Sequence, residues 1–240
     1  MERLSDQVIA IGHELMADLY RESPLYRALR DGTVSREAYL AWLVQTHKYI
    51  RWTNELLEGY ARAMASHPAA KARTIHVSAD RHAQEEHTHD RRVLEDVARM
   101  WGCPVDAALV RIDAEPTAPA VHLYGVVTHT TVEKFPAAFA GHTQVYEVLG
   151  GTISAAAWES FHARTPFEGC LDVIGIFDDH KEDAIHVSGG RIRVDLVEDP
   201  AERAAMLMVA RLAKDMYRGM VAWLDARLGS RVTGAELALK

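Results

Sequence analysis

The stretch SADRHAQEEHTHDRRVL, residues 78–94, contains a pattern that recurs about a hundred residues later. In it, His82 is followed four residues on by Glu86, and His89 comes three residues after that. Side chains separated by four and by three residues lie on the same face of an α-helix. If the stretch is helical, it directs two imidazoles and one carboxylate to one side.

The second pattern lies in VIGIFDDHKEDAIHV, residues 173–187, where Asp179, Asp183 and His186 repeat the same spacing. The residues that begin this stretch are strongly apolar, so the helix is expected to be buried, and buried charges at its end need a partner or a metal. A register shifted by one residue would bring in His180 in place of Asp179. Two such faces turned toward each other would form a mixed His/carboxylate cage, which suits one or two iron or manganese ions.

A third carboxylate lies between the two patterns, in VVTHTTVEKF, residues 126–135. An acid in an apolar, β-branched helix is costly unless it is used, so Glu133 is predicted to bridge or complete the cage. Glu86 and Glu133 are the candidate catalytic carboxylates. On the first helix Glu85 could replace Glu86 if the face is rotated. The alternative to a metal cage is a solvated, charged helix face, which is the usual meaning of such a charge run.

Composition excludes several classes of function. The chain has 240 residues, a formal charge of -7 and no long run of Lys or Arg, so neither nucleic acid nor an anionic membrane is an expected partner. Cys103 and Cys170 are far apart, as in a reduced intracellular protein, and the first residues lack the apolar core of a signal peptide. We therefore expect a cytoplasmic location. The sequence contains no Gly-rich phosphate loop, nucleophile elbow, CxxC or HExxH motif.

Helical periodicity runs through the whole chain and predicts one all-α domain, residues 1–240, with seven or more helices. The helices near 70–101, 118–140 and 167–188 should be adjacent in the core, and Gly150-Gly151 and Ser188-Gly189-Gly190 should separate helices. Residues 191–197, RIRVDLV, are interpreted as an extended loop. The other predicted helices span residues 4–20, 35–66, 105–112, 142–149, 153–164 and 199–228.

The stretch EEHTHDRRVLEDVARMWG, residues 85–102, in an all-helical chain of this length, resembles the superfamily of heme oxygenase, thiaminase-like proteins and pyrroloquinoline-quinone synthase. Within it the chain looks most like the heme-oxygenase-like diiron oxidases. Their ligands are a Glu and a His on one core helix, a single Glu on the next and a His-x3-Asp-x2-His run on a third. The corresponding residues here are Glu86, His89, Glu133, Asp179, Asp183 and His186. The chain departs from that pattern at Asp179, where the family has His, and at His82, where many members have their first Glu.

This resemblance implies a single heme-oxygenase-like helical bundle that activates dioxygen at a dinuclear iron centre. The expected cofactor is Fe²⁺, two ions per chain, with dioxygen as co-substrate and an external electron donor. The substrate would be a small carboxylate-bearing molecule derived from an amino acid or a fatty acid. A carboxylate needs a cation and an apolar wall, so the candidate substrate contacts are Arg51, Trp52, Tyr124 and Lys134. His47 and Glu55 could supply a ligand, line the pocket or make an interior polar contact.

Two other classes of function remain open. One is a metal-free enzyme of the same fold, in which His and Glu side chains act as acid–base groups. The other is a non-catalytic helical protein that uses the same cavity for a ligand. An apolar patch on the last helix fits core packing or a dimer face, and we expect a homodimer. The residues of this patch are Met206, Met208, Val209, Met216 and Met220.

Overall fold

The computed structural model describes residues 3–181 and 184–234, and of Ala184–His186 and Ser188 only the backbone. The fold-class prediction is confirmed, because these residues form helices joined by short loops, and their one β-type contact is an isolated bridge between Val34 and Thr233. The helices are α1 (Leu4–Glu22), α2 (Pro24–Arg30), α3 (Arg36–Ser66), α4 (Ala72–Glu86), α5 (His89–Trp101), α6 (Val105–Ala114), α7 (Pro119–Lys134), η1 (Pro136–Ala138), α8 (Phe139–Arg164), η2 (Cys170–Val173), α9 (Gly175–His180), α10 (Ala184–Asp195), α11 (Pro200–Leu228) and η3 (Gly229–Val232).

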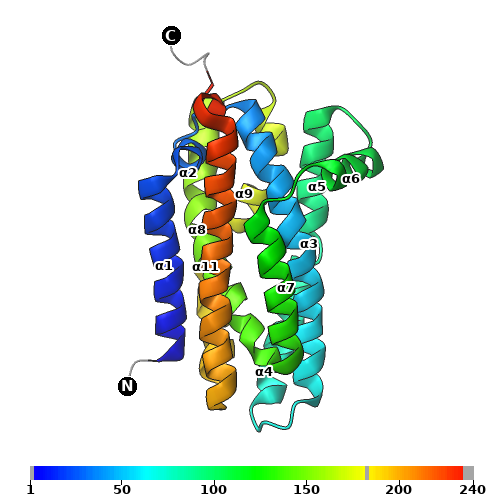
Figure 1. Cartoon of the computed structure of the whole chain (residues 1–240), viewed down its shortest axis with the longest axis vertical. Helices are drawn as coiled ribbons and strands as arrows, with labels where there is room; N and C mark the ends of the chain where they lie inside the picture. Colours follow the sequence, from blue (N-terminus) through cyan, green and yellow to red (C-terminus); the bar gives the residue numbers. More distant parts are fainter. Residues whose placement is uncertain (1–2, 182–183, 235–240) are drawn as a thin grey trace.

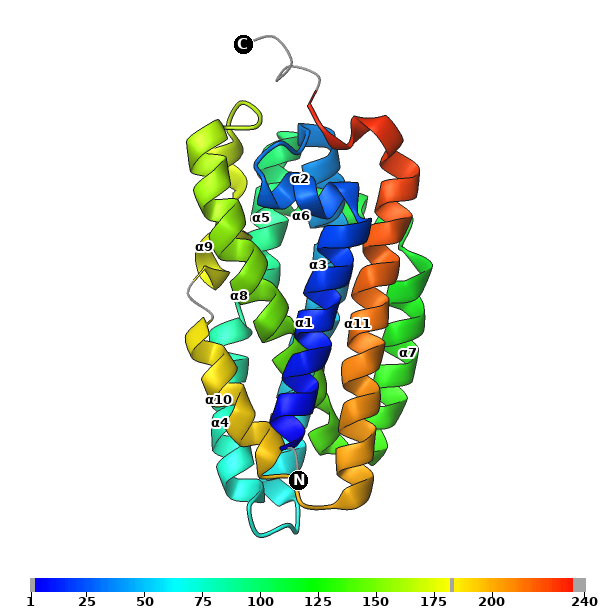
Figure 2. The same ribbon diagram turned by 90° about the vertical axis from the view of Figure 1, so that its left-hand side faces the viewer.

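The long helices run along one axis and form an elongated bundle (Figure 1). Helix α11 packs against α1, α7 and α8, while α3 packs against α4 and α5. Turning the molecule shows α10 beside α4 and α9 beside the upper part of α8 (Figure 2). Helix α8 contacts both α9 and α10, and α5 contacts α9. The two segments that carry the repeated pattern, α4–α5 and α9–α10, therefore meet next to α8.

Several helix ends follow from local side-chain chemistry. Ser35 accepts a hydrogen bond from the Ala38 backbone N–H, and Asp199 accepts two from the first turn of α11, so both residues are N-caps. Ser23 makes the same contact with Tyr26 and begins α2, with Pro24 in its first turn. The helices predicted from the sequence span residues 4–20 and 35–66, so the prediction missed α2.

The predicted helix at 70–101 is two helices, because a turn at His87 and Thr88 interrupts it. Glu86 is thus the last residue of α4 and His89 the first of α5. The predicted adjacency is also corrected. Helix α7 packs mainly against α11 and α3, whereas α8 packs against α9 and α10 of the second pattern and reaches the first through the contact of Glu147 with His82.

Two glycine pairs that were predicted to end helices lie inside them. Helix α8 continues through Gly150-Gly151, and α10 continues through Gly189-Gly190 to Asp195, so residues 191–195 are helical and not an extended loop. A glycine inside a helix costs about 1 kcal/mol relative to alanine, which packing can offset. At Gly190 the reason is visible, because a Cβ there would lie 2.0 Å from Gln144 Oε1 on α8.

The core joins residues from every long helix into one large hydrophobic cluster. On α11, Met206, Val209, Met216 and Met220 are buried, which confirms the core interpretation for these four, while Met208 is 42% exposed. The expected homodimer therefore stays a prediction. Within the described residues, no helix combines the length and the apolar character that crossing a membrane requires.

Candidate metal centre

Three side chains from α4, α5 and α9 meet at one point. Glu86, His89 and His180 each place a potential ligand atom within 4.8 Å of the other two. Glu86 Oε2 lies 2.5 Å from His89 Nδ1, and the rings of His89 and His180 are 4.6 Å apart between centroids. All three side chains are half-buried. The shifted register that would recruit His180 is therefore the one that brings a third ligand to this point.

Two buried groups extend this cluster toward α8. His82 Nε2 lies 3.3 Å from Glu147 Oε1 and 4.0 Å from Glu86 Oε1. His82 and Glu147 are each 6% exposed. His82 and Glu86 thus share an inward face of α4, as their spacing predicts, and His89 joins them from the first turn of α5, whereas Glu85 is exposed and pairs with Arg81.

Glu147 was missed by the sequence prediction, and Glu133 was chosen instead. Glu133 is exposed near the end of α7, and the structure does not bring it to the cluster. The rule that led to Glu133, an acid in an apolar helix, applies equally to Glu147 in VYEVLGG, residues 145–151. The supposed helix break at Gly150-Gly151 hid it, because it reduced this buried segment to a short helix.

Arg193 on α10 lies behind Glu147. Its Nη2 is 3.4 Å from Glu147 Oε1, and its Nη1 lies 3.4 Å from Ser78 Oγ and 3.5 Å from the Ser78 carbonyl oxygen. Arg193 is 4% exposed, so it is a buried guanidinium paired with a buried carboxylate. Interpreting residues 191–197 as an extended loop had removed Arg193 from the candidate residues.

The remaining residues of the second pattern divide into two groups. The Asp179 side chain is nearly buried and forms an ion pair with Arg92. It is not part of the group formed by Glu86, His89 and His180. Its Oδ2 has no hydrogen-bond partner among the described residues. Asp183 lies outside the described residues, and the side chain of His186 does too, so their predicted roles as ligands stay predictions.

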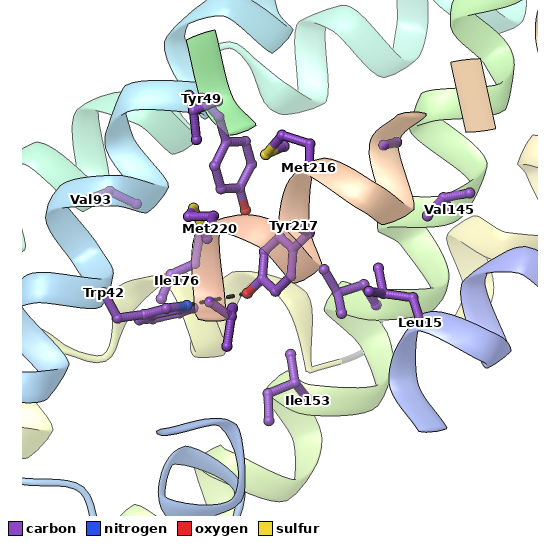
Figure 3. Packing of buried hydrophobic residues seen from close by; sticks show 14 of the residues in the cluster. Leu15, Trp42, Tyr49, Val93, Val145, Ile153, Ile176, Met216, Tyr217 and Met220 are labelled. Carbon is purple, nitrogen blue, oxygen red and sulfur yellow. Dashed lines mark hydrogen bonds between the residues drawn. The ribbon is translucent and has the colours of Figure 1, made fainter. Parts of the chain in front are cut away.

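A cavity of about 100 Å³ opens beside Glu86, His89 and His180. Its wall is aromatic and aliphatic, and Figure 3 shows Trp42, Tyr49, Ile153, Ile176 and Tyr217 in this part of the core. Trp42 Nε1 donates a hydrogen bond of 3.2 Å to Tyr217 Oη. The lining contains no Lys and no Arg among the described residues. Its neutral polar side chains include Thr46, Thr53, Asn54 and Ser154.

The predicted substrate contacts lie outside this lining. Arg51 bonds to Asp113 at 2.7 Å, Lys134 is exposed, and Trp52 packs against Gly125 on α7. Tyr124 is buried and hydrogen-bonded to His142, which does line the cavity.

The two residues of α3 whose roles were left open are also not part of the lining. Glu55 is exposed. His47 is buried, and burial together with the nearby Arg51 charge lowers its pKa to about 4. His47 is therefore a neutral interior group.

Electrostatics favour an ionised Glu86. Burial by itself would raise the pKa of Glu86, but the hydrogen bond with His89 and the positive potential of His89, His82 and His180 outweigh it and lower the pKa to about 2. The cluster thus holds the half-buried carboxyl group of Glu86 and the buried carboxyl group of Glu147, beside the buried guanidinium of Arg193.

This donor set fits a divalent metal ion. Two imidazoles and one carboxylate that leave open positions are the ligand set of non-heme Fe²⁺ sites, and His82 with Glu147 would add a second His/carboxylate pair beside the first. The ionised carboxylate of Glu86 would attract a cation to this point. Glu86, His89 and His180 would hold the ion.

Comparison with known proteins identifies the architecture. No protein-family model and no curated protein sequence matches the chain. Among solved structures, the chain is similar to a domain of unknown function with a heme oxygenase-like fold from Shewanella denitrificans OS217, with a TM-score of 0.70 and 15% identity over 96% of this chain and 95% of that one. The chain therefore has the heme oxygenase-like fold.

Proposed function

We propose that this protein is a non-heme iron enzyme, with up to two iron ions per chain, that activates dioxygen to oxidise a small molecule. The observation that carries the proposal is the meeting of Glu86, His89 and His180 at the side of an aromatic cavity. Bound iron would supply one-electron chemistry and a binding position for dioxygen. An external electron donor completes the proposal, because reducing dioxygen fully takes more electrons than most small substrates give.

The chain's own residues would hold, orient and shield the reaction. Arg193 would fix the direction of the Glu147 carboxyl group, because its Nη2 lies 3.4 Å from Glu147 Oε1. Asp96 accepts a hydrogen bond of 3.0 Å from the Gly175 N–H and so fixes the start of α9, which carries His180. The apolar wall excludes bulk water from the open side of the cluster.

The residues that line the cavity limit the chemistry of the substrate it would bind. Without Lys or Arg among the described lining residues, a substrate carboxylate would bind the metal itself or the neutral groups of Thr46, Asn54 and Ser154. Thr46 Oγ1 and Asn54 Oδ1 are buried and have no hydrogen-bond partner among the described residues, so they are available to a ligand. The rest of the substrate would be apolar, to match the aromatic wall. An amino-acid- or fatty-acid-derived metabolite meets both conditions.

Iron content and dioxygen uptake test the proposal. The protein is loaded anaerobically with Fe²⁺, its bound iron is quantified, and dioxygen consumption is followed with an electrode in the presence of a chemical reductant. We expect iron to bind and dioxygen to be consumed faster than by free Fe²⁺. His180→Ala should lose both properties, and His162→Ala, which changes an exposed histidine, should keep them. A metal-free protein that cannot be loaded with iron would refute the proposal.

One observation favours a second candidate, a metal-free acid–base enzyme. The Glu86–His89 hydrogen bond of 2.5 Å is also the arrangement in which a carboxylate orients an imidazole that accepts or donates a proton. This candidate predicts that chelation leaves activity unchanged and that dioxygen is not consumed. The same iron-loading and electrode measurements therefore separate the two.

A further inference from the structure

A buried tyrosine and a buried histidine connect α7 with the cavity. The Tyr124 hydroxyl is hydrogen-bonded to His142 Nδ1, and the two side chains are 5% and 1% exposed. On its other edge, His142 Nε2 lies 3.3 Å from Thr53 Oγ1. His142 and Thr53 both line the cavity, together with Glu86. A continuous row of hydrogen-bonding groups therefore runs from Tyr124 to the cavity wall.

The direction of these hydrogen bonds follows from the partners. The Thr53 hydroxyl donates its proton to the Tyr49 carbonyl oxygen at 3.1 Å, so Thr53 Oγ1 accepts from His142. His142 Nε2 therefore carries a proton, and in a neutral imidazole Nδ1 is then an acceptor, which makes Tyr124 the donor. Burial, together with the His82 charge, lowers the pKa of His142 to about 3 and keeps the imidazole neutral.

The other tyrosines near the cavity lack such a partner. Tyr146 Oη donates to the Ala213 carbonyl oxygen at 3.3 Å, and Tyr217 Oη accepts from Trp42. Neither a carbonyl group nor an indole N–H can take up a phenol proton, whereas a neutral imidazole can. Among the hydrogen bonds of the described residues, the hydroxyl of Tyr124 alone among tyrosines is bonded to a base.

The charge left behind in the protein determines whether Tyr124 can lose a proton, an electron or both. Loss of a proton alone would leave a buried phenolate, and burial raises the pKa of Tyr124, so that product is unfavourable. If Tyr124 lost an electron and its phenol proton stayed on His142, the imidazole would become a buried imidazolium. Burial disfavours that charged form as well. Loss of one electron and one proton together leaves every group neutral.

We propose that Tyr124, His142 and Thr53 supply one electron and one proton to an oxidant in the cavity. The inference rests on the proposed function, because the oxidant is the dioxygen-derived species of that reaction. The Tyr124 O–H bond breaks and its proton passes to His142 Nδ1, while the Nε2 proton passes to Thr53 Oγ1. The Thr53 hydroxyl turns from the Tyr49 carbonyl and gives its own proton to the oxidant, which also receives the electron. A neutral Tyr124 phenoxyl radical remains, and a one-electron reductant with a proton restores it.

Rapid freeze-quench electron paramagnetic resonance tests the proposal. Ferrous protein is mixed with dioxygen, and we expect a tyrosyl signal that narrows when ring-deuterated tyrosine is incorporated. Tyr124→Phe should lower the signal at least tenfold, whereas Tyr60→Phe, a buried tyrosine outside the cavity lining, and Tyr146→Phe, at the cavity wall, should keep it. Thr53→Val removes only the hydroxyl and should slow formation of the radical several-fold.

Dioxygen uptake measured in parallel distinguishes a failure of this inference from a failure of the proposed function. Dioxygen consumption without a Tyr124-dependent radical overturns this inference and leaves the proposed function standing. Absence of dioxygen consumption in every variant removes the proposed function and this inference with it. A radical that persists undiminished in Tyr124→Phe assigns the signal to another residue and also overturns the inference.

Nuclear magnetic resonance of metal-free protein gives a readout that does not depend on iron. With ¹⁵N-labelled histidine, we expect His142 to be neutral with its proton on Nε2, and its Nδ1 resonance should shift in Tyr124→Phe. A proton found on Nδ1 would mean that Tyr124 accepts and cannot donate, which contradicts the proposal. Unchanged thermal unfolding of Tyr124→Phe would show that the variant is folded.

Discussion

Glu86 Oε2 and His89 Nδ1 lie 2.5 Å apart across the break between α4 and α5. The break at His87 and Thr88 leaves those two residues exposed, while Glu86 and His89 turn toward α9. Two histidines only two positions apart thus have opposite environments. The turn between α4 and α5 determines that His89, and not His87, joins the cluster.

The first prediction follows from this contrast. His89→Ala should lower the amount of bound iron to background, because it removes one of three ligand atoms that lie within 4.8 Å of one another. His87→Ala is the matched control and should bind as much iron as the unchanged protein. Inductively coupled plasma mass spectrometry after anaerobic loading measures both. Equal iron content in the two variants would exclude His89 as a ligand.

The second prediction compares the two candidate carboxylates on α7 and α8. Glu147→Gln should weaken metal binding by about tenfold or more, because a buried carboxylate beside His82 loses its charge. Glu133→Gln changes an exposed side chain and should leave the affinity unchanged. Competition with a chromophoric chelator gives both affinities. If Glu133→Gln were the weaker binder, the carboxylate assigned from the sequence would be correct and the structural assignment wrong.

The third prediction concerns the buried ion pair. In metal-free protein, Arg193→Met should lower the free energy of unfolding by about 3–5 kcal/mol, because it leaves the Glu147 carboxylate buried without its guanidinium. Arg62→Met removes the partner of Glu58 in an exposed ion pair. It should change the free energy of unfolding by less than about 0.5 kcal/mol. Urea denaturation measures both. A small effect at Arg193 would mean that Glu147 is protonated in the folded state.

How much the sequence could predict depends on which interactions fix each feature. Spacing placed His82 and Glu86 on one face of α4, since helical periodicity is local, whereas His89 reaches the same point from α5. Glu133 and Glu147 could not be ranked locally, because both are acids in apolar helices and only the packing of α7 and α8 separates them. Asp179 and His180 are neighbours in α9, and only the packing of α9 against α5 shows that His180 meets Glu86 and His89 while Asp179 pairs with Arg92.

The glycine pairs illustrate the same limit. A local rule treats Gly-Gly as a helix terminator, yet α8 and α10 both continue through theirs. The close approach of α10 to Gln144 on α8 explains Gly190, and this contact joins residues far apart in the sequence. Arg193 can reach Glu147 because α10 continues past Gly189-Gly190 as a helix. Tertiary packing, rather than propensity, sets these elements.

The fourth prediction uses one of these pairs. Gly190→Ala should destabilise the protein and weaken iron binding, because its Cβ would lie 2.0 Å from Gln144 Oε1 and push α10 away from α8. Gly189→Ala has open space around its Cβ and should stabilise the helix, by up to about 1 kcal/mol. Thermal unfolding of the two variants gives the comparison. Equal stabilisation by both would mean that Gln144 moves aside without cost.

The last prediction concerns Asp96, which accepts a hydrogen bond from the Gly175 N–H where α9 begins. Burial raises the pKa of Asp96 from 3.8 to about 6, although the Gly175 hydrogen bond opposes this. A raised folded-state pKa means that the folded protein binds the proton more tightly than the unfolded chain. The stability that this proton contributes is fully present below about pH 4 and is lost as the pH rises through 6.

Asp96→Asn removes this titration while keeping an oxygen that accepts from Gly175. The stability of the unchanged protein relative to Asp96→Asn should therefore fall between pH 4 and pH 7, by an amount on the order of 1–3 kcal/mol. Urea denaturation of both proteins at pH 4, 5, 6 and 7 measures the difference. A constant difference across this range would show that Asp96 ionises normally. A difference that grows with pH would show that the ionised carboxylate stabilises the start of α9, because its charge-assisted bond to Gly175 would then outweigh the cost of burial.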